Sequence, residues 1–199
     1  VVVFGTSFRL MDGTDAERDA LLAYVPWAEA LGGAYLRVFD GGEDLNEPML
    51  ARGAAVLRWW NELRRRHEWK SELVIETHDS LLTAAAVRRF LDAMPRDTRI
   101  LWDAHHTWRK GGEDVVTTWA AIARAVAHMH VKDSVAVPSG RLPYTYVLPG
   151  AGDFPMARLR EALTRGEYAG ALSLEWERRW HPQLPPLEDA LAAADRGWW

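Results

Sequence analysis

The chain has 199 residues and contains no cysteine. Disulfide bonds and thiolate metal sites are therefore excluded, and aspartate, glutamate and histidine would have to hold any metal. Such ligands indicate a harder cation, or zinc bound without sulfur. A charge excess is also missing, because 24 lysines and arginines stand against 28 acidic residues. We expect no nucleic-acid partner, since proteins that bind the phosphate backbone usually carry a basic surface.

Long apolar runs are absent too, and no segment approaches the ~18 consecutive apolar residues that cross a bilayer. We therefore expect no membrane partner. Because no signal peptide is visible, we expect the protein to be cytoplasmic. Apolar residues nevertheless make up 48% of the chain, enough to bury one core. No glycine- and serine-rich linker or charge block divides the chain, so we expect a single domain over residues 1–199.

Short apolar segments rich in β-branched and aromatic residues alternate with longer segments in which apolar residues recur every three or four positions. The first kind predicts strands and the second predicts helices. No hairpin signal separates consecutive strands, so we expect parallel strands joined by helical crossovers. The predicted strands are Val1–Thr6, Ala34–Phe39, Leu73–Thr77, Arg99–Asp103, Ala127–Lys132 and Ala171–Trp176. The predicted helices are Ala16–Leu31, Met49–His67, Leu81–Met94, Val115–Val126, Pro155–Thr164 and Pro186–Ala194.

Local signals mark two helix ends. Asp79 and Ser80 are candidate caps for the helix that begins at Leu81. Gly32 and Gly33 are placed to end the first helix, because glycine readily adopts the left-handed conformation found there.

Two architectures join parallel strands by helical crossovers, and the residues after the first strand distinguish them. A doubly wound sheet usually binds its ligand at a glycine-rich turn after this strand. Here residues 5–13 read GTSFRLMDG, which lacks the G-x-G-x-x-G spacing. A (β/α) barrel instead gathers functional residues at the carboxyl ends of several strands. The sequence has this second pattern, and we expect an α/β fold of the TIM-barrel type.

Four predicted strands end in ionisable residues that a buried strand would avoid. Each carboxylate or imidazole follows an apolar run, so we expect each near the rim of the barrel. Alternation puts Glu175 and Glu177 on one face of their strand, and likewise His128 and His130, so one of each pair lies deeper. The four groups are Glu76, His78 and Asp79; Asp103, His105 and His106; His128, His130, Lys132 and Asp133; and Glu175 and Glu177.

Each of these residues also has a structural explanation. Asp103 could cap the following turn, His130 could be a hydrogen-bonded core histidine, and Glu76 could pair with a nearby arginine. Together they are harder to explain in this way. Three carboxylates and a histidine at one barrel mouth would repel one another and lose solvation unless a cation lay between them. The sequence therefore favours a metal centre.

Other residues near the predicted strand ends remain open to two interpretations. Arg37 and Asp40 could touch a substrate or pair with each other. Trp108 and Trp176 lie beside the predicted centre, and either could form a pocket wall against a sugar. The long loop LPYTYVLPGAGDFP, residues 142–155, is typical of a flap or substrate loop.

The four strand ends ETHD, WDAHH, HVKD and LEWE, with the loop LPGAGDFP, resemble the xylose isomerase-like barrel superfamily. This sugar-phosphate isomerase and epimerase group also includes ketohexose 3-epimerases and endonuclease IV. The resemblance covers nearly the whole chain and implies a TIM barrel of which about six of eight βα units are present. The strand that opens the chain would then correspond to the third strand of the family, so we expect an N-terminally truncated barrel. Unpaired strand edges would leave it poorly soluble or associated as a homo-oligomer.

The resemblance also implies roles for individual residues. One divalent cation would be held by Glu76, Asp103, His130 and Glu175, although Glu177 remains an alternative to Glu175. Manganese is the first expectation, with Mg²⁺, Co²⁺ or Zn²⁺ as alternatives. Glu76 and Glu175 would also be the acid and base that move a proton on a substrate carbon.

Further residues would bind the substrate, a small carbohydrate. The Asp-x-x-His spacing makes His106 the residue that binds a substrate oxygen, and Lys132 would stabilise an enediolate. His105 is expected to face away from the site. The remaining expected substrate contacts are His78, Trp176 and Arg37.

The function implied is a metal-dependent isomerase or epimerase of a sugar, sugar phosphate or related polyol, working through an enediolate. Three alternatives stay open. One is a phosphodiesterase like endonuclease IV, disfavoured because residues 134–150 contain neither aspartate nor histidine for a multinuclear site. The others are a dehydratase or lyase with similar ligands, and an inactive barrel that serves as a binding module.

Overall fold

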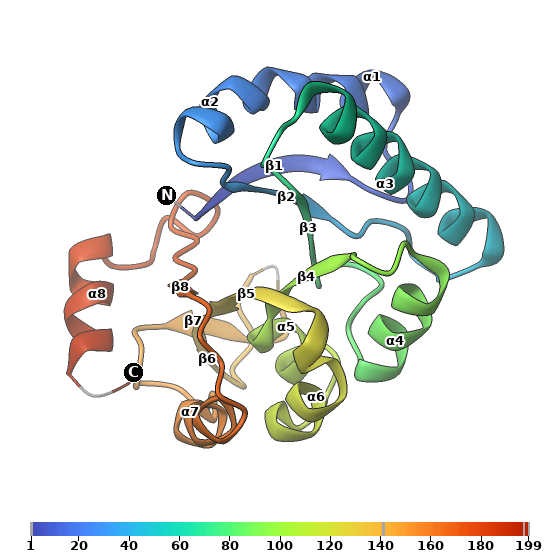
Figure 1. Ribbon diagram of the computed structural model, residues 1–199. Helices are drawn as coiled ribbons and strands as arrows, with labels where there is room; N and C mark the ends of the chain where they lie inside the picture. Colours follow the sequence, from blue (N-terminus) through green and yellow to red (C-terminus); the bar gives the residue numbers. More distant parts are fainter. Residues whose placement is uncertain (1, 141, 197, 199) are drawn as a thin grey trace.

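The computed structural model describes residues 2–140, 142–196 and 198, and its centre is a curved sheet of parallel strands (Figure 1). The strand order is β1-β2-β3-β4-β5-β8. Sequential neighbours pair because each crossover returns the chain to the same end of the sheet. The predicted α/β barrel-type fold is confirmed, with six parallel strands in a sheet that curls part of the way round. The strands are β1 (Val3–Arg9), β2 (Tyr35–Phe39), β3 (Leu73–Glu76), β4 (Arg99–Asp103), β5 (Val126–Val131) and β8 (Leu172–Leu174).

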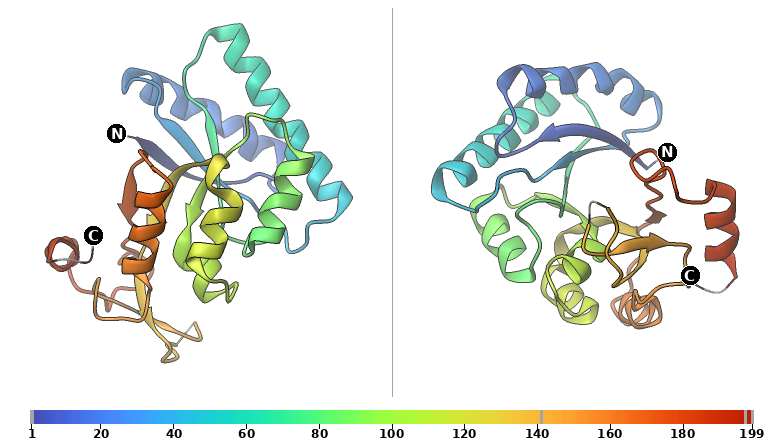
Figure 2. Two further views of the ribbon diagram at one scale, coloured as in Figure 1. Left: turned by 60° about the horizontal axis from the view of Figure 1, so that its bottom comes forward. Right: turned by 180° about the vertical axis from the view of Figure 1, so that it is seen from behind.

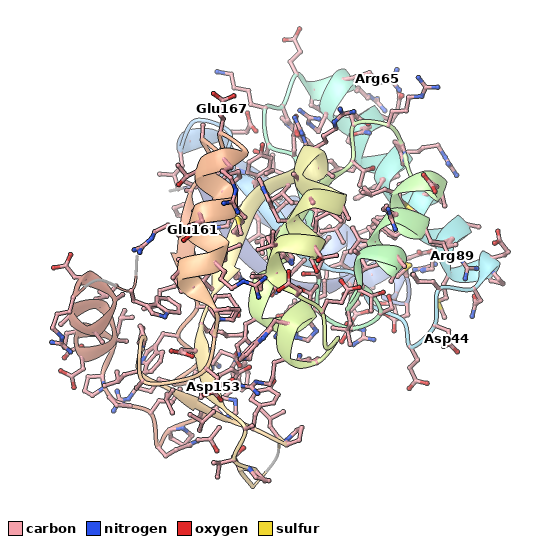
Figure 3. All side chains as sticks on the ribbon, turned by 90° about the horizontal axis from the view of Figure 1, so that it is seen from below. Asp44, Arg65, Arg89, Asp153, Glu161 and Glu167 are labelled. Atoms are coloured by element: carbon pink, nitrogen blue, oxygen red, sulfur yellow. The ribbon has the colours of Figure 1, made fainter. Side chains whose placement is uncertain are left out.

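Helices cover the outer, convex face of this sheet (Figure 1). Two short 3₁₀ segments, η1 (Leu21–Tyr24) and η2 (Ala123–Ala125), adjoin them. Charged side chains such as Arg65, Arg89 and Glu161 project from the outer surfaces of these helices (Figure 3). The helices are α1 (Asp15–Ala20), α2 (Val25–Ala30), α3 (Glu47–His67), α4 (Ala84–Ala93), α5 (Ala104–Arg109), α6 (Val115–Ile122), α7 (Met156–Arg165) and α8 (Leu187–Asp195).

The first predicted helix, Ala16–Leu31, is broken into α1, η1 and α2. Pro26 lies in the first turn of α2, where its missing N–H is harmless, but the same residue could not continue a longer helix. Gly32 and Gly33 do end the segment. Both have φ near +86°, and the Gly33 N–H donates to the Ala28 carbonyl at 2.9 Å.

The prediction that Asp79 and Ser80 cap the next helix is wrong. Helix α4 begins at Ala84, and its cap is Thr83, whose hydroxyl accepts from the Ala86 N–H at 3.1 Å. Asp79 and Ser80 instead donate their own N–H groups to the buried carboxylate of Asp40, at 2.9 and 2.6 Å. The loop after β3 is thus held by a contact from the loop after β2, which no local spacing reveals.

Two elements after β4 and β5 were not predicted. Helix α5 follows β4 directly, without the usual connecting loop. A small antiparallel hairpin of β6 (Asp133–Val135) and β7 (Thr145–Val147) follows β5, so the expectation of parallel strands alone is wrong. The hairpin projects beyond the sheet at the end where β5 finishes (Figure 2, left). It contains part of the loop predicted as a flap.

The two faces of the sheet differ in chemistry because side chains alternate along each strand. Ile100 and Trp102 of β4 belong to the apolar core beneath the helices, where Trp102 stacks on Trp119 of α6 with ring centres 6.1 Å apart. Asp103, beside them in sequence, lies on the inner face. The inner face therefore carries the ionisable groups, and the outer face carries the core.

The sheet ends at β1 and β8, which do not pair with each other. A cavity of about 440 Å³ lies between these two strands and reaches Arg37, His128 and His130 on the inner face. The predicted first residue of the opening strand, Val1, lies outside the described residues. None of the described helices is both long and apolar enough to cross a membrane.

Candidate metal centre

Four strands bring Glu76, Asp103, His130 and Glu175 together on the inner face of the sheet. Strand register explains part of this, because Asp103 pairs with His130 across β4 and β5. Glu175 follows β8 and donates its N–H to the Val131 carbonyl at 3.0 Å, which holds it beside β5. One ligand atom from each of the four side chains lies within 4.8 Å of the others. Glu76 and Asp103 are fully buried.

Several of these atoms lack a well-formed hydrogen bond. Both carboxylate oxygens of Glu76 and Nδ1 of His130 are buried in this state. Burying polar atoms without well-formed hydrogen bonds costs free energy, so such atoms in a fold usually face something that satisfies them. The donor set of three carboxylates and one imidazole fits a divalent cation, whose charge would satisfy all four side chains at once.

The formal charge of the centre also suits a divalent ion. Among the described residues, it contains four carboxylates. Three belong to the donor group, and the fourth is that of Glu177, which contacts Lys132 together with Glu175. Two cationic side chains contact these carboxylates, Arg37 at Glu76 and Lys132 at the other three. With the histidines neutral, two negative charges remain, which is the charge that one divalent cation neutralises.

Neighbouring charges shift the pKa values of the candidate ligands. Burial opposes protonation of His130, but its contacts with Glu175 and Glu76 outweigh burial and raise its pKa to about 10. Burial acts to raise the pKa of Glu175, yet the positive charges of Lys132 and His130 hold that pKa well below its ordinary value. Burial raises the pKa of Asp103, and Lys132 opposes this rise. Without a metal, a proton on His130 thus partly balances the carboxylates.

Asp103 is both a helix cap and a member of the donor group. It is the N-cap of α5, and its Oδ1 accepts from the His106 N–H at 2.9 Å. Its Oδ2 lies 2.9 Å from Lys132 Nζ on the side of the centre. The cap fixes the carboxylate, so one oxygen orients the side chain and the other remains available as a ligand.

His106, the residue expected to bind a substrate oxygen, lies beside the donor group. Its Nδ1 lies 3.0 Å from the Thr77 carbonyl oxygen. Because that oxygen can only accept, Nδ1 carries the hydrogen and Nε2 presents a lone pair. Nε2 faces Lys132 Nζ at 3.1 Å.

Lys132 is buried at the centre of the remaining contacts. Its Nζ lies 2.9 Å from Asp103 Oδ2 and 2.7 Å from Glu177 Oε1, and it also pairs with Glu175 Oε2. These carboxylates overcome the cost of burial and keep the pKa of Lys132 well above its ordinary value. These contacts favour the charged ammonium form of the side chain.

Of the other predicted substrate contacts, Arg37 is nearest to the donor group. Its Nε lies 3.0 Å from Glu76 Oε2, so Arg37 pairs with Glu76, and the pairing with Asp40 considered from the sequence is wrong. His78 packs on Phe39 and meets the edge of His106, with centroids 5.1 Å apart. Its Nδ1 lies 2.9 Å from a carboxylate oxygen of Asp79.

Two predicted residues face other parts of the molecule. Trp176 packs against an aromatic cluster of the hairpin and donates its indole N–H to the Pro185 carbonyl at 2.9 Å. Trp108 packs against Phe154 and under the guanidinium of Arg109. Neither indole is part of the donor group.

His105 and His128 are buried outside the four-residue donor group. His105 faces the hairpin, where its Nε2 lies 2.7 Å from Ser134 Oγ. His128 lies deeper in the barrel than His130, with Nε2 2.8 Å from Ser173 Oγ. These hydrogen bonds satisfy one nitrogen of each ring.

Tyr146 of the hairpin was missed as a residue of this site. Lys132 Nζ lies 5.4 Å from the centre of its ring, and the Tyr144 and Tyr146 hydroxyls lie 3.4 Å apart. His181, after β8, packs edge-on against Tyr146 with centroids 5.0 Å apart. The sequence YTYV contains the available signal, because alternating aromatic residues are typical of a strand with one buried face.

The whole of this architecture corresponds to a known family. The family model described as xylose isomerase-like TIM barrel matches residues 1–198. No curated protein matches the sequence.

Proteins of similar fold have been assigned different functions. The probable 3-DHS dehydratase AsbF from Bacillus anthracis has a TM-score of 0.71 at 16% identity, covering 88% of this chain and 70% of its own. The 3-keto-D-glucoside 4-epimerase YcjR from E. coli has a TM-score of 0.70 at 14% identity, covering 98% and 76%. The IolI protein, with a bound zinc atom, has a TM-score of 0.71 at 15% identity, covering 98% and 73%.

At these identities the neighbours support the fold alone, and the reactions named for the dehydratase and the epimerase differ from each other. The family model nevertheless matches almost the full length of the sequence. The six parallel strands and the strand-end donor group agree with that match. The chain belongs to the xylose isomerase-like TIM barrel family.

Proposed function

We propose that the protein is a divalent-metal-dependent isomerase or epimerase of a sugar, a sugar phosphate or a related polyol. The observation that carries this proposal is the convergence of Glu76, Asp103, His130 and Glu175 from four strand ends. Two of the four are glutamates, which can exchange protons with a substrate. One of the proteins of similar fold is named as an epimerase, which is the same class of reaction.

Manganese is the ion that we propose first, with Mg²⁺, Co²⁺ or Zn²⁺ as alternatives. Three carboxylates and one imidazole suit the harder divalent ions, and the zinc atom named for IolI keeps zinc among them. A divalent ion held by these side chains would supply a Lewis acid that acidifies a C–H bond next to a substrate carbonyl.

Glu76 and Glu175 are the residues that we propose to move the proton. One carboxylate removes a proton from the substrate carbon, which gives an enediolate, and the other returns a proton from the opposite side. Glu76 Oε1 and Glu175 Oε1 lie 3.6 and 3.5 Å from the same atom, His130 Nδ1, so both carboxylates face one centre. Return to the same carbon inverts it, and return to the neighbouring carbon moves the carbonyl.

Polar side chains around this pair would orient the substrate. His106 and Lys132 are proposed to bind substrate oxygens, with the lysine charge stabilising the enediolate. Arg37 would keep the Glu76 carboxylate in position through their 3.0 Å contact. His78 and Trp176 are the remaining proposed substrate contacts.

Metal content is the first test. Wild-type protein dialysed against Mn²⁺ and then against buffer is expected to retain about one ion per chain, which atomic emission measures. Glu76→Gln should retain less, because an amide carries no charge and is a weaker ligand. Glu72→Gln is the matched control, since Glu72 pairs with Arg64 away from the centre. A wild type that retains no divalent ion would contradict the proposal.

The reaction itself is tested with a panel of ketoses and ketose phosphates in deuterium oxide. We expect deuterium at the carbon next to the carbonyl, together with an isomeric or epimeric sugar, detected by NMR. Loss of water from the substrate would identify a dehydratase instead, and cleavage of a phosphodiester substrate would identify a hydrolase. A phosphodiester substrate is therefore included beside the panel, and a metal-loaded protein without turnover on any of these substrates would point to a binding module.

A further inference from the structure

Lys132 occupies a position that is itself built to hold a cation. Its side chain is 2% exposed and lies among Asp103, Glu175 and Glu177. A buried lysine in a single ion pair is common enough, but this one faces three carboxylates. The negative charge of these three carboxylates exceeds the single positive charge of the ammonium group.

The imidazole beside Lys132 is oriented as a metal-ligating histidine would be. The Thr77 carbonyl fixes the hydrogen of His106 on Nδ1, at 3.0 Å, so the lone pair on Nε2 points to Lys132 Nζ at 3.1 Å. Histidine ligands of metals usually donate their second N–H to a carbonyl or carboxylate in this way. Here the lone pair of His106 faces the ammonium group of Lys132 in place of a metal ion.

These groups make a second donor set beside the first. His106, Glu175 and Glu177 each offer one ligand atom within 4.8 Å of the others. Glu175 belongs to both sets. Its Oε1 lies 3.5 Å from His130 Nδ1 and its Oε2 pairs with Lys132, so one carboxylate spans the two cation positions. A shared carboxylate of this kind is a usual feature of centres with two metal ions.

We propose that the Lys132 ammonium is a resident cation in a second metal position and limits the centre to one divalent ion. This inference rests on the proposed function for the first ion, held by Glu76, Asp103, His130 and Glu175. The ammonium satisfies His106 and Glu177 without an exchangeable ion. It also keeps a fixed positive charge where the substrate oxygens are proposed to bind.

The test removes the positive charge of Lys132 and keeps the shape of its side chain. Lys132→Met preserves an unbranched side chain of similar length and removes the ammonium. Titration with Mn²⁺, followed by equilibrium dialysis and by the electron paramagnetic resonance signal of free Mn²⁺, should count about one bound ion in wild type and about two in Lys132→Met. The second ion should interact magnetically with the first and broaden its spectrum. Lys132→Arg, which keeps the charge, should bind about one ion.

A second variant shows where the additional ion binds. Glu177 belongs only to the second donor set, so Lys132→Met combined with Glu177→Gln should return to about one ion. Two ions in this double variant would contradict the assignment of Glu177 to the second position.

The outcomes separate this inference from the proposed function. A wild type without bound Mn²⁺ contradicts the proposed metal centre. One ion in both wild type and Lys132→Met contradicts only the role of Lys132. Should Lys132→Met be unfolded without metal, recovery of its circular dichroism at two equivalents of Mn²⁺ supports the inference. Recovery at one equivalent, or none at any concentration, overturns it.

Discussion

At the scale of single residues, the inner face of the barrel carries ionisable groups whose partners decide their charge. Glu175 and Lys132 are charged because each faces opposite charges at close range. His105 and His128 are different, since each makes one hydrogen bond among the described residues, to a serine hydroxyl. Burial lowers the pKa of His105 to about 2, assisted by the positive charges of Lys132 and Arg109. Burial also lowers the pKa of His128 to about 4.

The stability of the protein should therefore fall in acid. Below the ordinary histidine pKa of 6.5, the unfolded chain binds protons at His105 and His128 that the folded chain does not bind. The free energy of unfolding then decreases as the pH falls, by about 2 kcal/mol for each histidine between about pH 7 and about pH 5. Urea denaturation at a series of pH values measures this slope.

His105→Gln should make the pH dependence shallower, because the amide keeps a hydrogen-bonding group near Ser134 without titrating. His67→Gln, at an exposed position on α3, is the matched control. An unchanged slope in His105→Gln would show that His105 is not a source of the acid sensitivity.

At the scale of elements, the hairpin of β6 and β7 is held by the carboxylate of Asp133. Its Oδ1 accepts from the N–H groups of Ser134 and Phe154, and its Oδ2 accepts from those of Gly150 and Gly152, all between 2.8 and 3.0 Å. Gly152 is required here, since a Cβ would lie 2.3 Å from Asp133 Oδ1. The loop sequence LPGAGDFP is thus explained by a backbone that wraps around one carboxylate.

Asp133→Asn should destabilise this hairpin. An asparagine oxygen can still accept two of the four hydrogen bonds, but its NH₂ group would face the other two N–H donors. We expect a loss of about 2–4 kcal/mol in the free energy of unfolding, since charge-assisted bonds contribute about 1.5–3 kcal/mol each. Hydrogen exchange at Gly150 and Gly152 should accelerate. Asp153→Asn, an exposed change in the same loop, should leave both measurements nearly unchanged.

At the scale of the whole molecule, the curved sheet has two free edges. β1 and β8 end the sheet without pairing to each other, and the 440 Å³ cavity lies between them. Gly5, Ser7 and Arg9 on the inner face of β1 are exposed. Unpaired N–H and C=O groups along such edges can pair with another chain.

We therefore predict that this chain associates as its concentration rises. Sedimentation velocity over a concentration series should show the weight-average sedimentation coefficient increasing. Association should also bury the edge of β1, so that its amide hydrogens exchange more slowly at high concentration. A constant monomer at all concentrations would refute this prediction.

The strand ends were the most predictable part of the site. A carboxylate or imidazole that ends an apolar strand of a parallel sheet lies at the edge where the carboxyl ends of the strands meet. Glu76, Asp103 and His130 lie together at this edge. The choice between Glu175 and Glu177 was open in the sequence, because alternation puts both on one face. In the structure Glu175 belongs to both donor sets and Glu177 to the second alone.

Contacts between loops were not predictable. Asp40 accepts from the backbone after β3, and Asp133 from the backbone beyond β7, and neither contact follows from local spacing. Helix α5 was missed because it has only six residues and begins directly at its cap, Asp103, too short for a periodic pattern to show.

The sequence by itself determined the barrel-type fold and the residues at its strand ends, since apolar periodicity and the position of polar residues are local properties of the chain. Only the tertiary structure decided which charges meet. The pairing of Arg37 with Glu76, and the burial of Lys132 among three carboxylates and His106, depend on atoms brought together from different strands. Electrostatic interaction depends on distance in space and on burial, and neither can be read from spacing along a chain.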